Sequence, residues 1–512
     1  MQSFETLLPT LGSLSQVAPD ARAQLEATLL ELVAEDADRL PAVLHELRSA
    51  ASPDDAAAAD RLLDRLLGRL APSLRASLDE QAVDDLAQLY RRLANTDSAR
   101  PRLLRLLAAD GRKPALRAFA ELLASDPPQG EQEAALAFVP LFQSRELAAE
   151  ALFPRLFDCL AHPALAAIVL DLSNYLFRKG LVARHPAAER AAQLAALLQN
   201  LVRRLGRIEE QPAEFATSPQ QLNRMIGESV ALVVSLCDAV ALLGNAEATA
   251  KLYEALELRH RRVRTEAAAA LLRLGDEAGL ETLLAMTAEP VVRTRALRYL
   301  EELDRLDRVP ANRASPAARA EGALAAWLAE PAHFGVPPGG LELVDARRQH
   351  WPGFEEPLDC FLFRFEYRIG NQALAGVGIA GPVAHAFMSD LQDLSPDDIY
   401  AAYAGWFAEH AEIRQTPADG LSPAQHETWR SVAGEIEAAG YQEIELVLRG
   451  VFFGREQWVA KAERHGLAGV LVVDDGHLAW YPQPQTSRPP GPIVVYDIHK
   501  GREILRAFNP DE

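Results

Sequence analysis

Cysteine is scarce in this chain of 512 residues. The three cysteines, Cys159, Cys237 and Cys360, lie far apart and form no CxxC pair. Because their number is odd and their spacing irregular, the sequence supports neither a disulfide framework nor a zinc knuckle. We therefore expect a reducing, cytoplasmic location.

Long apolar runs and targeting signals are also missing. No run approaches the 18 or so uncharged apolar residues that a membrane span needs, so the sequence predicts no transmembrane helix. The first residues, MQSFETLLPTLG, carry Glu5 and no early basic residue, which does not match a secretory signal. We expect no association with a membrane.

Basic residues are outnumbered by acidic ones, and the formal net charge is −20. Residues 321–512 contain 28 acids and 14 bases, a net charge of −14, whereas residues 1–320 contain 44 acids and 38 bases, a net charge of −6. An acidic chain repels a phosphate backbone at long range. Nucleic-acid binding would therefore need a concentrated basic face, and we expect no nucleic-acid partner.

Tryptophan is absent from the first 326 residues. All six lie further on, at Trp327, Trp351, Trp406, Trp429, Trp458 and Trp480. Upstream, the chain is rich in Ala, Leu, Arg and Glu, which favour helices, and its apolar residues recur at steps of three and four, as in Leu62, Leu63, Leu66, Leu67 and Leu70. Prolines such as Pro41, Pro53 and Pro101 mark the joints. Residues 1–310 are therefore predicted to form many helices joined by short turns.

Two short motifs recur near the end of this region. VRTEAA at 263–268 returns as VRTRAL at 292–297, and LGDEAG at 274–279 has a counterpart in LGNAEA at 243–248. Each repeat predicts a helix, a turn with a C-capping glycine, and a second helix. Over about 228–305 the pattern resembles HEAT repeats, especially the short variety of the phycobilisome-lyase-like families. The resemblance implies an α-solenoid whose long faces bind other macromolecules.

A basic cluster, RHRRVR at 259–264, stands out against the acidic background. In the repeat pattern it falls where one helix ends and the next begins. Arg259, Arg261 and Arg262 can then stabilise the negative end of the preceding helix, while Arg264 reaches Glu266 or a neighbouring repeat. We favour this structural interpretation over a nucleic-acid-binding patch.

Residues 311–512 are predicted to form a smaller α+β domain, whose family the sequence does not reveal. The alternation in DCFLFRFEYR (359–368) indicates a strand, and Gly370-Asn371 a hairpin turn into QALAGVGIA. Helices are predicted from Ser315-Pro316 to about 329 and at 382–392, 396–410 and 423–439. Further strands are predicted at 441–451, at 468–481 with a turn at Asp475-Gly476, and at 492–499. The fold class is thus mostly α, a HEAT-like solenoid followed by an α+β domain.

Two motifs in this domain allow a chemical interpretation. The segment from Gly376 to Gly381 matches GxGxxG, which in a dinucleotide site follows a parallel strand and opens a helix. Here it follows the second arm of a hairpin, so tight strand packing is the better explanation. Cys360 and His385 could form a thiolate–imidazole pair, but a buried structural cysteine is favoured.

Other residues could hold a metal. Asp474, Asp475, His477, Asp497 and His499 carry carboxylate and imidazole groups that ligate metals. However, Asp475-Gly476 is typical of a turn, and Asp497 and His499 fit the solvated face of a strand. The sequence lacks a metalloprotease HExxH, a phosphate-binding loop, a nucleophile elbow and the Glu-His pairs of HEAT-type hydroxylases. We predict no metal, no cofactor and no catalytic residue.

An aromatic stripe on one predicted helix is the candidate partner-binding surface. Tyr400, Tyr403, Trp406 and Phe407 recur at helical spacing. Such a stripe is typical of a core, and any part that is exposed would be the first place to look for a partner.

These patterns predict a non-catalytic scaffold or adaptor that binds one or more proteins through the solenoid face. The alternative is an enzyme of lyase type, resembling the HEAT proteins that attach tetrapyrroles. Its site would lie in the C-terminal domain, around Cys360, His385 and the glycine-rich turn.

Overall fold

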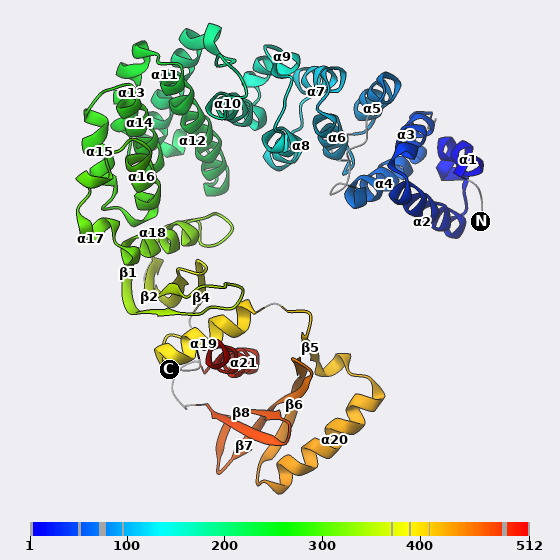
Figure 1. The fold of residues 1–512 in the computed structure, drawn as a ribbon, viewed down its shortest axis with the longest axis vertical. Helices are drawn as coiled ribbons and strands as arrows, with labels where there is room; N and C mark the ends of the chain where they lie inside the picture. The colour runs from blue at the N-terminus through cyan, green and yellow to red at the C-terminus, as the bar shows by residue number, and fades with distance from the viewer. Residues whose placement is uncertain are drawn as a thin grey trace. The chain divides into compact units, whose positions relative to one another are not determined.

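The chain forms two compact units, unit 1 (Met1–Thr282) and unit 2 (Leu283–Glu512). The computed structural model describes residues 4–49, 53–70, 78–94, 97–369, 372–388, 391–408, 410–483 and 489–509. Unit 1 is helical and unit 2 contains two antiparallel sheets with helices (Figure 1). The predicted class, mostly α with an α+β C-terminal part, is confirmed. The predicted domain boundary near 310 falls inside unit 2.

The helices of unit 1 follow one another with short connections. The α-helices are α1 (Phe4–Leu7), α2 (Pro19–Glu35), α3 (Leu40–Arg48), α4 (Pro53–Leu70), α5 (Glu80–Arg92), α6 (Arg100–Asp110), α7 (Lys113–Ser125), α8 (Glu131–Gln143), α9 (Ala149–Leu152), α10 (Pro163–Arg178), α11 (Ala191–Glu210), α12 (Pro219–Leu242), α13 (Thr249–Leu256), α14 (Arg261–Arg273) and α15 (Ala278–Met286), which crosses into unit 2. Short 3₁₀ segments lie at Leu8–Gln16, Ala37–Arg39, Arg155–Ala161, Ala188–Arg190, Pro212–Glu214 and Ala246–Ala248.

Leucine stripes hold these helices together. In α4, the side chains of Leu62, Leu63, Leu66 and Leu67 are all buried. Helices two apart in sequence pack against each other, as α4 does with α6, α10 with α12, and α12 with α14, and one apolar core runs through the unit. A core that is built from contacts between neighbouring helices fits an α-solenoid-like arrangement.

Glycine follows α12 and α14 at their ends, as the repeat pattern predicts. Gly244 after α12 has φ +62° and Gly275 after α14 has φ +87°. The backbone N–H that follows each glycine donates across the helix end, from Asn245 to the carbonyl of Val240 at 3.1 Å and from Asp276 to that of Leu271 at 3.0 Å. These are Schellman-type caps, which need a residue that tolerates positive φ.

Helix α12 is the one described helix with the length and apolar character of a membrane span, with a mean hydropathy of 1.9. Half of its most apolar window is buried, and the helix packs against α10, α11 and α14. These contacts are those of a helix that packs within the helical array of unit 1.

Unit 2 contains the remaining elements. Its helices are α16 (Pro290–Glu302), α17 (Ala311–Ala314), α18 (Pro316–Leu328), α19 (Pro396–Phe407), α20 (Pro423–Ala438) and α21 (Pro492–Phe508), with 3₁₀ segments at Leu306–Arg308 and Ala418–Gly420. Sheet A has the order β1 (Gly340–Gln349), β2 (Leu358–Ile369), β3 (Gln372–Ala380), β4 (His385–Met388). Sheet B has the order β5 (Ile413–Pro417), β6 (Gln442–Phe452), β7 (Arg455–Arg464), β8 (Leu467–Asp474), β9 (His477–Pro482). All pairs are antiparallel.

Most of unit 2 consists of two modules with the same order of elements, a helix, a four-stranded meander and a second helix. Module A is α18, β1–β4 and α19, and module B is α20, β6–β9 and α21. In each module the first helix covers one face of the sheet and the last helix covers the other. The alternation of β2 is confirmed, because Phe363 and Phe365 pack toward α18 whereas Leu362 packs toward α19.

The last helices of the two modules pack against each other (Figure 1). Both contain the pattern PxxxYxxxxG, at 396–405 in α19 and at 492–501 in α21. A Cβ on Gly405 would lie 2.0 Å from the carbonyl oxygen of Asp497, and one on Gly501 would lie 1.7 Å from that of Ala401. Since Asp497 and Ala401 hold equivalent positions, the contact is pseudo-symmetric.

Two predicted elements are wrong. Residues 382–392 contain the short strand β4 instead of a helix, because HAFM pairs with the edge of β3. Residues 492–499 begin the helix α21 instead of forming a strand. Their β-branched residues favour a strand, but Pro492 opens a helix whose apolar stripe, Val495, Ile498 and Ile504, is buried. Strands β1, β5 and β7 were not predicted, and the turn at Gly370-Asn371 lies outside the described residues.

Candidate functional site

A polar cluster lies inside module B, where sheet B meets α21. Asp474 ends β8, and His499 and Glu503 are four residues apart on α21, so that they share one helix face. Each of the three offers a ligand atom, and these atoms lie within 4.8 Å of one another. Asp474 is 7% exposed. The sequence predicted Asp474 and His499 as possible ligands and missed Glu503.

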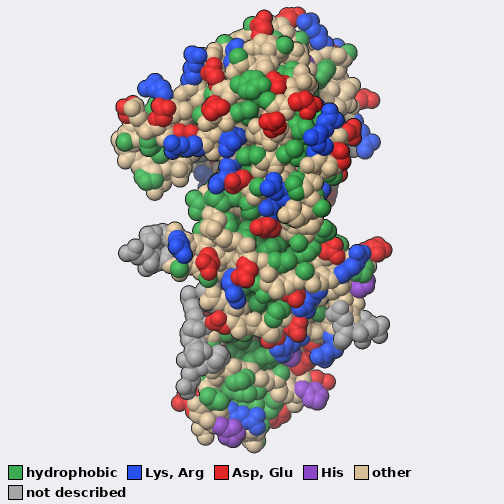
Figure 2. All heavy atoms as spheres, turned by 90° about the vertical axis from the view of Figure 1, so that its left-hand side faces the viewer, with side chains coloured by type: hydrophobic (Ala, Val, Ile, Leu, Met, Phe, Trp, Pro, Cys, Tyr) green, Lys and Arg blue, Asp and Glu red, His purple; other side chains and the backbone are tan. Residues whose placement is uncertain are grey.

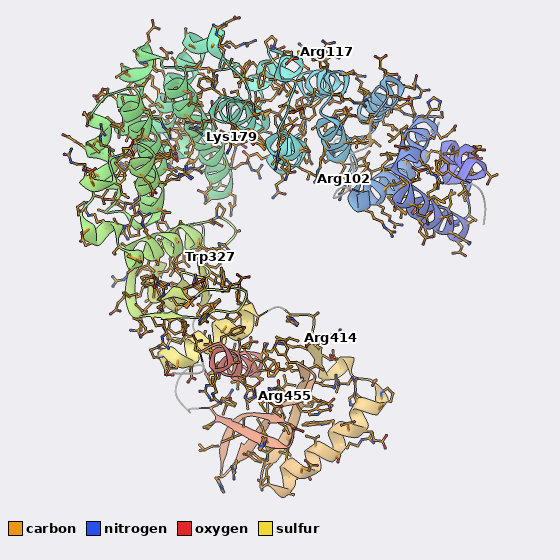
Figure 3. All side chains as sticks on the ribbon, viewed as in Figure 1. Arg102, Arg117, Lys179, Trp327, Arg414 and Arg455 are labelled. Carbon is orange, nitrogen blue, oxygen red and sulfur yellow. The ribbon has the colours of Figure 1, made fainter. Side chains whose placement is uncertain are left out.

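Neighbouring side chains fix the orientation of these groups. Arg455, labelled in Figure 3, pairs with Asp474 at 3.1 Å and with Glu503 at 2.9 Å. Gln457 Nε2 donates to Asp474 at 2.8 Å. The Tyr481 hydroxyl lies 2.9 Å from Nδ1 of His499. Burial lowers the pKa of His499, although Glu503 and Asp474 oppose this shift, so the imidazole is neutral at pH 7.

An apolar groove opens beside the cluster. Its volume is about 930 Å³. Arg455 and Glu503 line it, together with Trp406, Phe407, Phe452, Phe453 and Phe508, among other residues. The volume is in the range of small-molecule and peptide-binding sites, and the groove joins an apolar surface to a pair of opposite charges.

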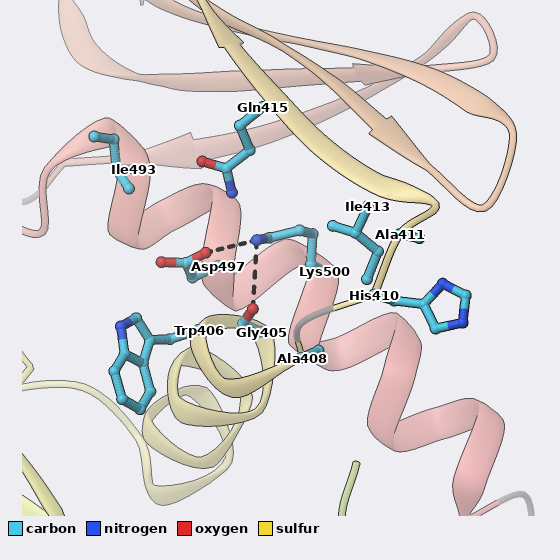
Figure 4. A pocket seen from close by; sticks show the side chains of 10 residues that line it. All are labelled: Gly405, Trp406, Ala408, His410, Ala411, Ile413, Gln415, Ile493, Asp497 and Lys500. Carbon is cyan, nitrogen blue, oxygen red and sulfur yellow. Dashed lines mark hydrogen bonds and ion pairs between the residues drawn. The ribbon is translucent and has the colours of Figure 1, made fainter. Parts of the chain in front are cut away.

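A second pocket, with a volume of about 590 Å³, lies between α19, β5 and α21 (Figure 4). Lys500 is 3% exposed and pairs with Asp497 at 2.8 Å, and its Nζ also lies 3.4 Å from the carbonyl oxygen of Gly405. Burial raises the pKa of Asp497, with Lys500 opposing the shift. The sequence grouped Asp497 with His499, but the structure places Asp497 in this second pocket.

The other predicted metal ligands lie elsewhere. Asp475 occupies the turn between β8 and β9 with φ +47°, and His477 is exposed at the start of β9. Neither belongs to the cluster of Asp474, His499 and Glu503. The turn at Asp475-Gly476 was predicted and is confirmed.

The candidate pair of Cys360 and His385 has no support in the structure. Cys360 lies on β2 and His385 on β4, two strands apart in sheet A, which corresponds to about 10 Å. Burial raises the pKa of Cys360 to about 11, so the group is a thiol at neutral pH. The His385 ring stacks on Trp406, with centroids 3.9 Å apart.

The glycines at 376–381 serve close packing. Gly376 and Gly378 lie within β3, between β2 and β4, and no helix follows β3 directly. A Cβ on Gly378 would lie 2.8 Å from Leu324 in α18, and one on Gly381, at φ +123°, would lie 2.0 Å from the carbonyl oxygen of Asp359. This antiparallel context does not match a dinucleotide site.

The aromatic stripe of α19 is divided between core and surface. Tyr400 and Tyr403 are fully buried, and their hydroxyls donate to the carbonyl oxygens of Cys360 at 3.2 Å and Val377 at 2.8 Å. Trp406 is 43% exposed, and both Trp406 and Phe407 line the groove. The part of the stripe that remains available to a ligand is its C-terminal end.

The basic cluster at 259–264 covers the turn before α14 and the first turn of that helix. The carboxylate of Glu209, near the end of α11, accepts hydrogen bonds from the backbone N–H groups of Arg259 at 2.9 Å and His260 at 3.1 Å. Over the face drawn in Figure 2, acidic and basic side chains are interspersed. The predicted position at the junction of two helices is confirmed.

The chain matches no protein-family model. No curated protein sequence matches it either.

Proposed function

We propose that the protein is a non-catalytic adaptor whose groove in unit 2 binds an apolar segment of a protein partner. One observation carries this proposal. Exposed aromatic side chains gather at the groove, where Trp406 is 43%, Phe453 49% and Phe508 47% exposed. Exposed apolar patches on soluble proteins mark interaction sites, and aromatic residues dominate the energy of such interfaces.

An extended segment is the form of ligand that fits the groove best. Strand β5 is at the edge of sheet B, and its first residue, Ile413, lines the groove. An edge strand offers backbone groups for pairing with an added strand. Since residues 321–512 carry a net charge of −14, we expect basic residues beside the apolar segment of the partner.

The helical unit would supply a second binding surface. Its array of helix pairs supports a HEAT-like α-solenoid, and such arrays bind proteins along their faces. This part of the proposal depends on analogy at the level of the fold. Three free, buried cysteines fit a cytoplasmic location.

The test compares groove variants of the full chain. Phe453→Ser and Phe508→Ser remove groove aromatics, and Leu467→Ser is the matched control, because Leu467 is 43% exposed on β8 and does not line the groove. A partner is first identified by purification from the native host, and its affinity for each purified variant is then measured by calorimetry. We expect each groove variant to bind about tenfold or more weakly, as for an interface hot spot, and the control to bind like the wild type. Equal affinity of all the variants would contradict the proposal.

A lyase-type enzyme is the second candidate, and the pocket of Figure 4 favours it. A buried lysine in a pocket is a common nucleophile or base, and Lys500 faces that space beside Asp497. A chromophore that copurifies with the wild type and is lost from a Lys500→Met variant that circular dichroism shows to be folded would support the enzyme. A colourless wild-type protein with a groove-dependent protein partner would support the adaptor.

A further inference from the structure

We propose that Asp474, His499 and Glu503 form a binding site for one divalent metal ion of the first transition row, such as Zn²⁺ or Mn²⁺. The site goes beyond the proposed adaptor function, and its test is independent of any protein partner. An imidazole nitrogen with two carboxylates is a ligand set that these ions accept. The ligand atoms lie within 4.8 Å of one another, whereas a tetrahedral site needs about 3.4 Å. Side-chain rotations would close the difference.

Two buried atoms of this cluster have no hydrogen-bond partner among the described residues. They are Oδ1 of Asp474 and Nε2 of His499. The Asp474 side chain is only 9% exposed, and Nε2 lies 3.9 Å from its other oxygen, Oδ2. Leaving a buried polar atom unsatisfied costs about 1–3 kcal/mol. A cation between the two groups would satisfy both atoms at once.

The surrounding hydrogen bonds match those of a metal site. If Nδ1–H of His499 donates to the Tyr481 oxygen, 2.9 Å away, the lone pair of Nε2 is turned toward Asp474. Histidine ligands in metal sites are usually held by such a bond from the other ring nitrogen. Arg455 and Gln457 bind Oδ2 of Asp474, and Arg455 binds Oε2 of Glu503. Each carboxylate therefore keeps a second oxygen for the metal.

Module A shows that the fold does not require these polar groups. Gln457 and Asp474 are cross-strand partners in β7 and β8, and the equivalent partners in β2 and β3 are Leu362 and Ile379. The PxxxYxxxxG patterns of α19 and α21 align His499 with Tyr403 and Glu503 with Phe407. Module A thus packs the same position with apolar and aromatic side chains. Because buried charges are costly, their presence in module B alone points to a ligand.

A purely structural role makes a different prediction. In that case the ion pairs of Arg455 with Asp474 and Glu503 would be enough to hold the cluster together, and the cluster would bind no ion. The two accounts are separated by adding metal to the chelator-treated full chain. Calorimetry with Zn²⁺ and with Mn²⁺ gives the affinity and stoichiometry, and Co²⁺ gives the visible spectrum of the ligand field.

We expect one equivalent of metal per chain. Glu503→Gln should weaken binding by at least tenfold, and Tyr481→Phe by about 10–100-fold, as for other residues that orient a ligand. His477→Ala is the matched control, because this exposed histidine lies on the adjoining strand β9, outside the cluster, and its affinity should not change.

Absence of saturable binding of all three ions would overturn the proposal, and so would equal binding by the wild type and Glu503→Gln. The Glu503 side chain is 26% exposed, so this variant should fold. Circular dichroism checks this, and His499→Gln provides a second ligand variant if the check fails.

Discussion

Replacing Gly501 by alanine should destabilise unit 2, although alanine favours helices. Gly501 lies in the middle of α21, where the helix crosses α19. The added Cβ would lie 1.7 Å from the carbonyl oxygen of Ala401 and 2.5 Å from its carbonyl carbon. The obstacle is backbone, so no side-chain rotation relieves the clash. The two helices would have to separate by about 1.5 Å to reach an ordinary contact distance.

The size of the effect follows from two opposing contributions. Alanine gains up to about 1 kcal/mol over glycine in a helix interior. Overpacking in a close-packed core costs about 1–3 kcal/mol, and more where the backbone must move. We expect a net loss of about 2 kcal/mol in the free energy of unfolding. The matched control is Gly434→Ala in α20, where Gly434 is exposed and an added Cβ meets no described atom within 4 Å. This control should be more stable than the wild type by about 0.5–1 kcal/mol.

Tryptophan fluorescence measures the stability of unit 2, the part of the chain that contains Gly501. All six tryptophans lie in unit 2, so their emission during urea titration follows that unit alone. With a urea dependence of about 2 kcal/mol per molar, the two variants should differ by more than 1 M in their unfolding midpoints. If Gly501→Ala has a urea midpoint at or above that of the wild type, the two helices do not approach each other as closely as the structure indicates.

Two further predictions concern buried ionisable groups. Burial lowers the pKa of His185 to about 4, from about 6.5 in an unfolded chain. Between these two pH values only the unfolded chain binds a proton at this residue. The free energy of unfolding of unit 1 should therefore fall as the pH falls from 6.5 to 4, by up to about 1.4 kcal/mol per pH unit. His185 contacts α10, because its Nε2 lies 3.0 Å from Oδ1 of Asn174 in that helix. Hydrogen exchange in α10, corrected for intrinsic rates, should show this fall, and His185→Gln should remove it. A wild type as stable at pH 4.5 as at pH 7 would disprove the prediction. Lys500→Ala leaves Asp497 buried without its partner and should cost about 3–5 kcal/mol in urea unfolding. The double variant with Asp497→Ala should cost less, and a larger, additive loss would refute the coupling of the pair.

The helices of unit 1 could be predicted from the sequence because their signals are local. Leucine spacing, proline at the first helical turn and glycine after the last one each act within a few residues. Gly244 and Gly275 lie at the positions that the repeat pattern predicts. A solenoid-like array adds contacts mainly between neighbours, so local signals account for most of its structure.

Segment 492–499 was predicted wrongly because its local signal opposes its tertiary environment. PIVVYDIH favours a strand by composition, yet Gly501 allows the close approach to α19 that buries it as a helix. The same error hid Glu503. His499 and Glu503 come close to each other only when the chain between them is helical, since in a strand residues four apart share a face but lie about 13 Å apart. Asp474, from a different element, joins them only through the tertiary fold.

The duplicated architecture of unit 2 gives a sequence signal that does not depend on assigning each element correctly. PxxxYxxxxG occurs twice at a separation of 96 residues, and both copies end a module. Positions where the two copies agree, such as Tyr400 and Tyr496, carry the shared packing, since both side chains are fully buried. Positions where the two copies differ, such as Phe407 and Glu503, do not have to maintain this shared packing. A charged residue at a position where the other module has a partly buried aromatic costs stability unless it is paired or binds a ligand, which is why the differences between the modules support the proposed metal site.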